Sequence, residues 1–356
     1  MNQQDFDFLK ELVEAPSPSG YEQPAARRLR HEMEGVADEL RTDLMGNVIA
    51  RIRGQGDNPL KVMLAGHCDE IGFIVQYIDD NGYIFFQPIG GIDPHIVPGQ
   101  RVTIHTAQGP VLGVVGKKPI HLMEAKDRDT VVKFRNQFID IGAADKEETT
   151  ALVAIGDPVT FAVSLERLQG DRLTSRAFDD KMGAFVVAQV LKEVRRRGGV
   201  AVDLYGVFTV QEELGLRGAR TSAYGIAPDI GIAIDVSFAT DCPEIEKKEL
   251  GEIRLGRGPI LSRGANINPR LFQMLTETAR VKEIPFQVEA AARATGTDAN
   301  AIQVNRDGVA AALVSVPLRY MHTPVEVLSR ADLDYTVQLL AELLYRIGNR
   351  EDFIPN

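Results

Sequence analysis

Features that would place a protein outside the cell are scarce in this chain. Only two of its 356 residues are cysteines, Cys68 and Cys242, so a disulfide framework is excluded and a reducing compartment fits. The chain has no apolar run long enough to cross a bilayer and no charged-then-apolar leader. We therefore expect a cytoplasmic protein with no membrane partner.

Positive charge is also in short supply. The chain has 40 Lys and Arg against 50 Asp and Glu, a net charge of −10 at pH 7. Nucleic-acid-binding proteins present basic surfaces, so nucleic acid is not an expected partner. The length and an apolar fraction of 44% suffice for a large core, which is typical of a soluble enzyme.

Two adjacent carboxylates, Glu212 and Glu213, follow the apolar run 202–208. Successive side chains of an extended segment diverge, so one carboxylate can hold a metal ion while the other handles a proton on metal-bound water. Acidic pairs are also common in solvated loops. The pair becomes informative because other apolar runs in the chain end in metal-capable side chains as well.

The first such run, residues 61–66, leads into His67, and Asp69 follows two positions later. On a strand these two side chains project to the same side, and a metal-bound imidazole usually donates its other N–H to a carboxylate. A histidine in a turn, satisfied by a neighbouring aspartate, explains this segment equally well.

Three further segments offer Asp179 or Asp180, Asp235 and His322. Asp179 and Asp180 precede a helical pattern, so either side chain could cap the helix or bind a metal ion. For Asp180 the two roles are equally favoured, and for Asp179 metal binding is favoured. Asp235 ends a buried-strand pattern, and His322 follows one. Ligands bind at the carboxyl ends of strands in mainly parallel sheets, so these groups can converge. They are too many for one tetrahedral zinc and suit two ions about 3.5–4 Å apart that share one carboxylate.

Motifs in the segments 67–72, 177–181, 211–218 and 322–326 resemble those of the M42 family of metallo-aminopeptidases, which includes glutamyl aminopeptidases and tetrahedral archaeal aminopeptidases. The likeness runs nearly end to end. It implies that His67 and Asp235 are terminal ligands of one ion, that Glu213 and His322 are those of the other, and that Asp179 bridges them. Glu212 would be the general base and Asp69 the partner of His67. Asp180 remains a rival for the bridge.

The pattern of elements predicts a three-layer α/β/α catalytic domain from residues 1–70 and 162–356. Residues 71–161 instead show short strands punctuated by Gly, Pro and Asp, which predicts an inserted β-barrel or sandwich. The resemblance assigns this insert to dimerisation and to a dodecamer built from dimers.

The expected reaction is removal of the N-terminal residue from short peptides with two divalent ions, zinc or cobalt, or else manganese. A deacylase or carboxypeptidase on the same fold is the nearest alternative. A non-enzymatic metal-binding scaffold or regulatory protein would need the metal ligands but would give Glu212 no function. An endoglucanase-type glycosidase needs two carboxylates roughly 5–10 Å apart across the bond, and adjacent glutamates do not fit that need. Residues 262–268 are a candidate pocket loop, in which Arg263 either favours acidic substrates or is simply solvated.

Overall fold

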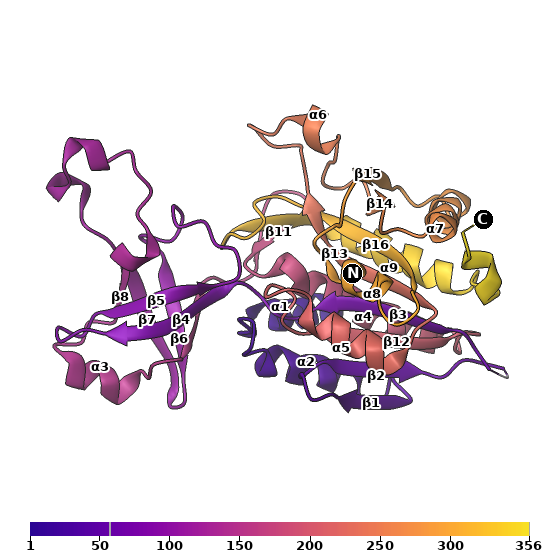
Figure 1. Ribbon diagram of the computed structural model, residues 1–356, viewed down its shortest axis with the longest axis horizontal. Coiled ribbons are helices and arrows are strands. Elements are labelled where there is room, and N and C mark those ends of the chain that lie inside the picture. The colour runs from indigo at the N-terminus through magenta and orange to yellow at the C-terminus, as the bar shows by residue number, and fades with distance from the viewer. Residues whose placement is uncertain (57, 356) are drawn as a thin grey trace.

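The computed structural model describes residues 1–56 and 58–355, which form two parts (Figure 1). A larger α/β part contains both ends of the chain, and a smaller barrel of strands projects from one side of it. Within the described residues, no helix combines the length and apolarity that crossing a membrane requires.

A sheet of eight strands, counted over the described residues, lies in the middle of the larger part. Its order is β1 (Glu39–Thr42), β2 (Val48–Ile52), β12 (Asp203–Thr209), β3 (Lys61–His67), β13 (Ile230–Phe238), β16 (Ala310–Leu318), β14 (Ile260–Gly264) and β15 (Gln287–Ala291). The central neighbours β12, β3, β13 and β16 run parallel, and β2 and β14 pair antiparallel with them on either side. The parallel strands therefore end at one common edge.

Helices cover both faces of this sheet. Along β3, Val62 and Leu64 join the core on one face, whereas Met63 and Ala65 pack on the other. The first face carries α1 (Gln3–Glu14), α2 (Gln23–Met33), α4 (Phe178–Arg196), α7 (Pro269–Val281) and α9 (Arg330–Leu344), and the second carries α5 (Arg217–Ile226) and α8 (Asp298–Gln303). This is the predicted three-layer α/β/α fold.

Helix α1 shows how the sequence specifies these layers. The side chain of Asn2 accepts the backbone N–H of Asp5 and caps the helix, and apolar residues at helical spacing make its inner face. The buried residues of α1 are Phe8, Leu9, Leu12 and Val13.

The smaller part is a closed barrel with a core of its own. Its antiparallel strands follow the order β4 (Gly72–Ile78), β5 (Ile84–Ile89), β8 (Phe138–Asp140), β7 (Gly109–Gly116), β6 (Arg101–Thr106) and β9 (Pro158–Phe161). Phe73 meets Phe86 and Phe161 edge to face inside it, and α3 (Lys146–Leu152) lies against β4. The chain enters the barrel directly after β3, so the predicted inserted β-barrel is confirmed as part of the fold.

Shorter elements complete the chain. Strands β10 (Glu166–Arg167), β11 (Arg172–Ser175) and β17 (Glu326–Ser329) form a small sheet that sets Glu326 beside Ser175, close to the start of α4. The remaining elements are α6 (Lys247–Leu250) and the 3₁₀ turns Ile120–Leu122, Ala125–Asp127, Phe134–Asn136 and Arg350–Phe353.

Candidate active site

The common edge of the parallel strands holds a cavity of about 450 Å³. His67 ends β3, Asp235 lies near the end of β13, and Glu212 and Glu213 follow β12. Asp179 comes from the first turn of α4, and His322 from the loop after β16. These six side chains all line the cavity, so the structure brings the predicted ligands and the predicted base together.

Two clusters of metal-capable groups lie side by side here. His67, Asp180 and Asp235 form one and Asp179, Glu213 and His322 the other, and the ligand atoms within each cluster lie within 4.8 Å of one another. Asp179 connects them. One of its oxygens, Oδ1, lies 3.2 Å from Nε2 of His67, and the other, Oδ2, lies 3.2 Å from Nε2 of His322.

The two adjacent aspartates differ in what their oxygens already bind. The fully buried carboxyl of Asp180 accepts the backbone N–H of His67 and that of Gly183, each at 3.1 Å. Neither Asp179 nor Asp180 has helical backbone angles, so the regular part of α4 begins after them and the two side chains diverge. Asp179 therefore presents both oxygens to the imidazoles, while Asp180 is engaged with the backbone.

The donor set suits a divalent cation. Oε1 of Glu213 is buried and lacks a hydrogen-bond partner among the described residues, and it lies 3.3 Å from Nε2 of His322. A buried acceptor of this kind requires a partner. Imidazoles and carboxylates converging on one point are the ligands that zinc, cobalt and manganese accept, so the residues present fit bound metal.

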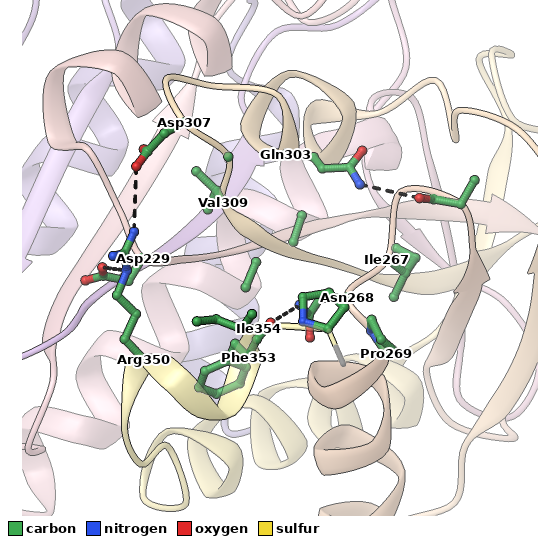
Figure 2. A pocket seen from close by; sticks show the side chains of 15 residues that line it. Asp229, Ile267, Asn268, Pro269, Gln303, Asp307, Val309, Arg350, Phe353 and Ile354 are labelled. Atoms are coloured by element: carbon green, nitrogen blue, oxygen red, sulfur yellow. Dashed lines mark hydrogen bonds and ion pairs between the residues drawn. The ribbon is translucent and has the colours of Figure 1, made fainter.

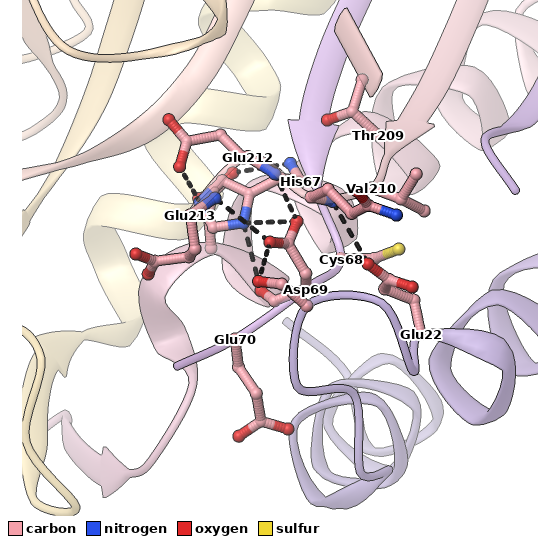
Figure 3. Close-up of polar contacts among 12 residues, drawn as sticks. Glu22, His67, Cys68, Asp69, Glu70, Thr209, Val210, Glu212 and Glu213 are labelled. Carbon is pink, nitrogen blue, oxygen red and sulfur yellow. Dashed lines mark hydrogen bonds and ion pairs between the residues drawn. The ribbon is translucent and has the colours of Figure 1, made fainter. Parts of the chain in front are cut away.

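Asp69 contacts both the segment that carries Glu212 and Glu213 and the imidazole of His67 (Figure 3). Its carboxylate accepts the backbone N–H groups of Glu212 at 3.0 Å and Glu213 at 3.2 Å, and the hydroxyl of Ser19 at 2.6 Å. Nδ1 of His67 lies 3.1 Å from the Asp69 carbonyl oxygen and 3.4 Å from its carboxylate. Burial would raise the pKa of Asp69, but the contact with His67 and these hydrogen bonds hold it below its usual value. Asp69 is thus tied to the glutamate pair as well as to its predicted partner.

Glu212 occupies a buried, acidic environment. Burial raises its pKa, the nearby His67 opposes this, and Asp235 and Asp298 raise it further. One of its oxygens lies 3.8 Å from Nε2 of His67. Asp298 is itself buried and accepts the hydroxyl of Thr209 at 2.6 Å. A carboxyl whose pKa is raised in this way can both take up and release a proton near neutral pH once a cation lies beside it.

Glu326 was not singled out from the sequence, although it belongs to the motif 322–326. It is buried, and its two oxygens accept the backbone N–H of Asp179 at 3.1 Å and that of His322 at 3.0 Å. One carboxyl group therefore fixes the backbones of two predicted ligands. Only the pairing of β17 with β11 reveals this role, because Asp179 lies 147 residues away in sequence.

A buried ion network supports the segment that follows His67. Glu70 pairs with Arg176 and, at 2.8 Å, with Lys181, and it accepts the N–H of Ser17. Burial raises the pKa of Glu70, but the two cations lower it more, to about 2. Burial lowers the pKa of Lys181 to about 8, because the attraction of Glu70 is partly cancelled by repulsion from Arg176. Each of the two cations is therefore stabilised by the same carboxylate, that of Glu70.

A larger hollow of about 540 Å³ lies at the opposite edge of the sheet, where β13 and β16 begin (Figure 2). Its two carboxylates, Asp229 and Asp307, pair with Arg350 at 3.1 and 3.9 Å. The described residues that line it include neither histidine nor cysteine. Its size does not make it the reactive site, because both of its carboxylates are already paired with the same arginine.

The fold and this cluster define a metal-dependent hydrolase of the α/β/α type. The M42 glutamyl aminopeptidase family matches residues 46–339, and the chain belongs to that family. A lysyl aminopeptidase of Pyrococcus furiosus is 41% identical over 354 residues, 99% of each chain. A TET aminopeptidase from a marine sediment archaeon of the Thaumarchaeota is 34% identical, with a TM-score of 0.94 over 99% of each chain.

A third relative is known to form large assemblies. The TET1 peptidase of Pyrococcus horikoshii, which can assemble into a tetrahedron or a large octahedral shell, is 30% identical. It superposes with a TM-score of 0.86 over 96% of this chain and 100% of its own. The predictions of family, fold and metallo-aminopeptidase activity are confirmed, and the roles of single residues stay predictions.

Proposed function

We propose that this chain removes the N-terminal residue of short peptides with two divalent ions, zinc or cobalt. His67 and Asp235 would hold one ion, Glu213 and His322 the other, and Asp179 both. The observation that supports this most directly is the placement of the two Asp179 oxygens, one against each imidazole. When bound, such ions polarise the scissile carbonyl and lower the pKa of water.

Glu212 is the proposed general base. Its backbone is held by Asp69, and its side chain faces the cavity beside His67. In this proposal its carboxylate takes a proton from the attacking water and gives it to the leaving amine. Its raised pKa supports the second half of this cycle, because a carboxyl that holds a proton can act as an acid.

Replacing Glu212 by Gln tests the proposal, since glutamine has the same shape but cannot accept the proton. We expect both ions to remain bound while turnover falls about a hundredfold or more. Elemental analysis and steady-state kinetics on aminoacyl chromophores measure the two quantities. Full activity in metal-replete Glu212→Gln protein contradicts the role.

Peptides with a blocked N-terminus separate the nearest alternative. An aminopeptidase needs the free amine as an anchor, whereas a deacylase or a carboxypeptidase does not. We expect acetylated peptides to remain intact under conditions in which their free counterparts are cleaved. Cleavage of both at similar rates would favour the alternative.

We also propose that residues 71–161 are a domain for self-assembly, inserted into a catalytic domain of residues 1–70 and 162–356. The assembling TET1 relative and the exposed apolar residues of the barrel support this, for example Leu112 at 61% and Val114 at 48% exposure. A dodecamer built from dimers, located in the cytoplasm, would enclose its active sites and admit only short peptides.

The names of the family and of its members do not establish which N-terminal residue this chain prefers. The family is called glutamyl aminopeptidase, and a relative 41% identical is called lysyl aminopeptidase. These side chains carry opposite charges, so the preference has to come from the wall of the cavity.

A further inference from the structure

The cavity extends from the candidate metal centre along β13. Asp235 and Ser237 are alternate residues of this strand, so their side chains project to the same face about 7 Å apart, at roughly 3.3 Å per residue. Both line the cavity, together with the apolar side chains of Leu216, Phe238 and Met321. The cavity wall therefore continues from Asp235, a proposed metal ligand, to Ser237 on the same face of the strand.

A carboxylate lies directly behind Ser237. The hydroxyl of Ser237 donates to one oxygen of Glu289 on β15 at 2.6 Å, and the hydroxyl of Ser262 on β14 donates to the other at 2.6 Å. Ser262 pairs with Glu289 in the register of β14 and β15 and is buried, whereas Glu289 is half-buried. Two neutral hydroxyls orient this carboxylate but leave its charge in place.

Among the described residues, the carboxylate oxygens of Glu289 are bound by these two hydroxyls, and no Lys, Arg or His side chain forms an ion pair with it within 4.0 Å. Arg263 follows Ser262 on β14 and therefore points to the opposite face. Its guanidinium lies 5.6 Å from the ring centre of Phe272. The arginine considered from the sequence as a selector of acidic substrates is thus turned away from Glu289.

We propose that Glu289 determines specificity for peptides that begin with a basic residue, lysine or arginine. This inference rests on the proposed aminopeptidase function. With the α-amine near Asp235, the four-carbon stem of a lysine spans the distance to Ser237 and brings its ammonium to Glu289. The apolar walls cover the stem, as they do for amphipathic side chains whose charged end is bound separately. An acidic side chain would meet a like charge instead.

Replacing Glu289 by Gln tests the charge with little change of shape. Glutamine still accepts one of the two serine hydroxyls, and its amide can donate to the other. The substrates are chromophores carrying N-terminal Lys, Arg, norleucine or Glu, since norleucine has the lysine stem without the ammonium. We expect the variant to lose about 10- to 100-fold in kcat/KM for Lys and Arg and less than about twofold for norleucine. Glu166→Gln, at an exposed position of β10, is the matched control and should change none of these values.

The pattern across substrates decides the outcome. If kcat/KM falls equally for Lys, Arg and norleucine, Glu289 has only a structural role between the strands. If the ratio of kcat/KM for Lys to that for norleucine does not change, the charge of Glu289 does not contribute to specificity. Either result overturns the inference and leaves the aminopeptidase proposal intact. Calorimetry with free L-lysine and L-norleucine gives a second readout, in which the preference for lysine should disappear in Glu289→Gln. If wild-type protein cleaves no free N-terminus, the proposed function fails, and calorimetry still decides whether Glu289 binds a cationic side chain.

Discussion

At the scale of single residues, the acids behind the cavity act on the backbone of the candidate ligands. Asp69 accepts the N–H groups of Glu212 and Glu213, and Glu326 accepts those of Asp179 and His322. Buried carboxyl groups that accept backbone N–H groups fix the positions from which ligand side chains extend. The geometry of the site therefore depends on residues outside the proposed ligand set.

Glu326→Gln should show this dependence. Glutamine has one acceptor oxygen, so one buried N–H, of Asp179 or of His322, loses its partner at a cost of about 1–3 kcal/mol in unfolding free energy. Metal affinity should fall about 10- to 100-fold because the ligands lose their orientation. Denaturant unfolding of the metal-free protein and metal titration measure the two effects. Glu166→Gln is the control, and equal values for all three proteins would remove Glu326 from this role.

The ion network around Glu70 predicts a dependence of stability on pH. The pKa of Glu70 is about 2 in the folded chain, against an ordinary value of 4.5. Its stabilising contribution is therefore complete above pH 4.5 and is lost as the pH falls toward 2. We expect about 3 kcal/mol of unfolding free energy from this group to vanish over that interval, at about 1.36 kcal/mol per pKa unit.

Unfolding of metal-free protein at a series of acidic pH values measures this loss, and Glu70→Gln should flatten it. Because that variant leaves Arg176 and Lys181 buried beside a neutral side chain, Glu70→Gln combined with Lys181→Met is a second comparison with less uncompensated charge. An equally steep loss of stability in wild type and in both variants would assign the acid sensitivity to other groups.

At the scale of elements, the site depends on how closely β3 approaches α4. A methyl group added at Gly66, next to His67, would lie 2.5 Å from the backbone carbon of Gly183 and 2.6 Å from the nitrogen of Ala184. These are backbone atoms of α4, which cannot move aside alone. The small residue thus permits the contact that brings Asp179 and Asp180 to His67.

Gly66→Ala should therefore push α4 away from the sheet. We expect a loss of about 1–3 kcal/mol in unfolding free energy from overpacking, together with reduced metal content. Gly225→Ala in α5 is the control, because a methyl group there meets no atom within 4 Å. Normal metal content in Gly66→Ala would show that the site tolerates a displaced helix.

The sequence allowed most of the elements and their convergence to be predicted. Buried-strand patterns such as 230–234, each ending in a ligand type, are enough to place side chains at one sheet edge. The choice between Asp179 and Asp180 could not be predicted, because it depends on backbone angles that are non-helical inside an apparent helix. Glu289 could not be recognised either, since its contact with Ser237 joins strands 52 residues apart in sequence.

At the scale of the whole molecule, the barrel projects from the catalytic part with its own core (Figure 1), and the segment after β5 reaches the site, where the carbonyl oxygen of Gly91 lies 2.6 Å from Nδ1 of His322. It contributes none of the six predicted metal and base residues that line the cavity. Its exposed apolar side chains include Tyr77, Leu112, Val114, Leu152 and Ile155. An outer surface of this kind on a projecting part is suited to contact with another copy of the chain.

Light scattering should report an assembly much larger than a dimer, active on short peptides and inactive on folded proteins. Leu112→Glu together with Val114→Glu, which places two charges on β7, should yield smaller species with an unchanged metal content. A wild-type monomer at micromolar concentration with full activity would refute the assembly and leave the proposed mechanism standing.

The spread of the predicted ligands along the chain also bears on when the enzyme becomes active. They extend from His67 to His322 and come from five separate segments. Domains fold during synthesis from the N-terminus onward. A nascent chain therefore holds an incomplete set of the proposed ligands until the segment that carries His322 has been made. Without His322 one of the two proposed ions lacks a terminal ligand, so we expect a chain that ends before this segment to be inactive as a peptidase.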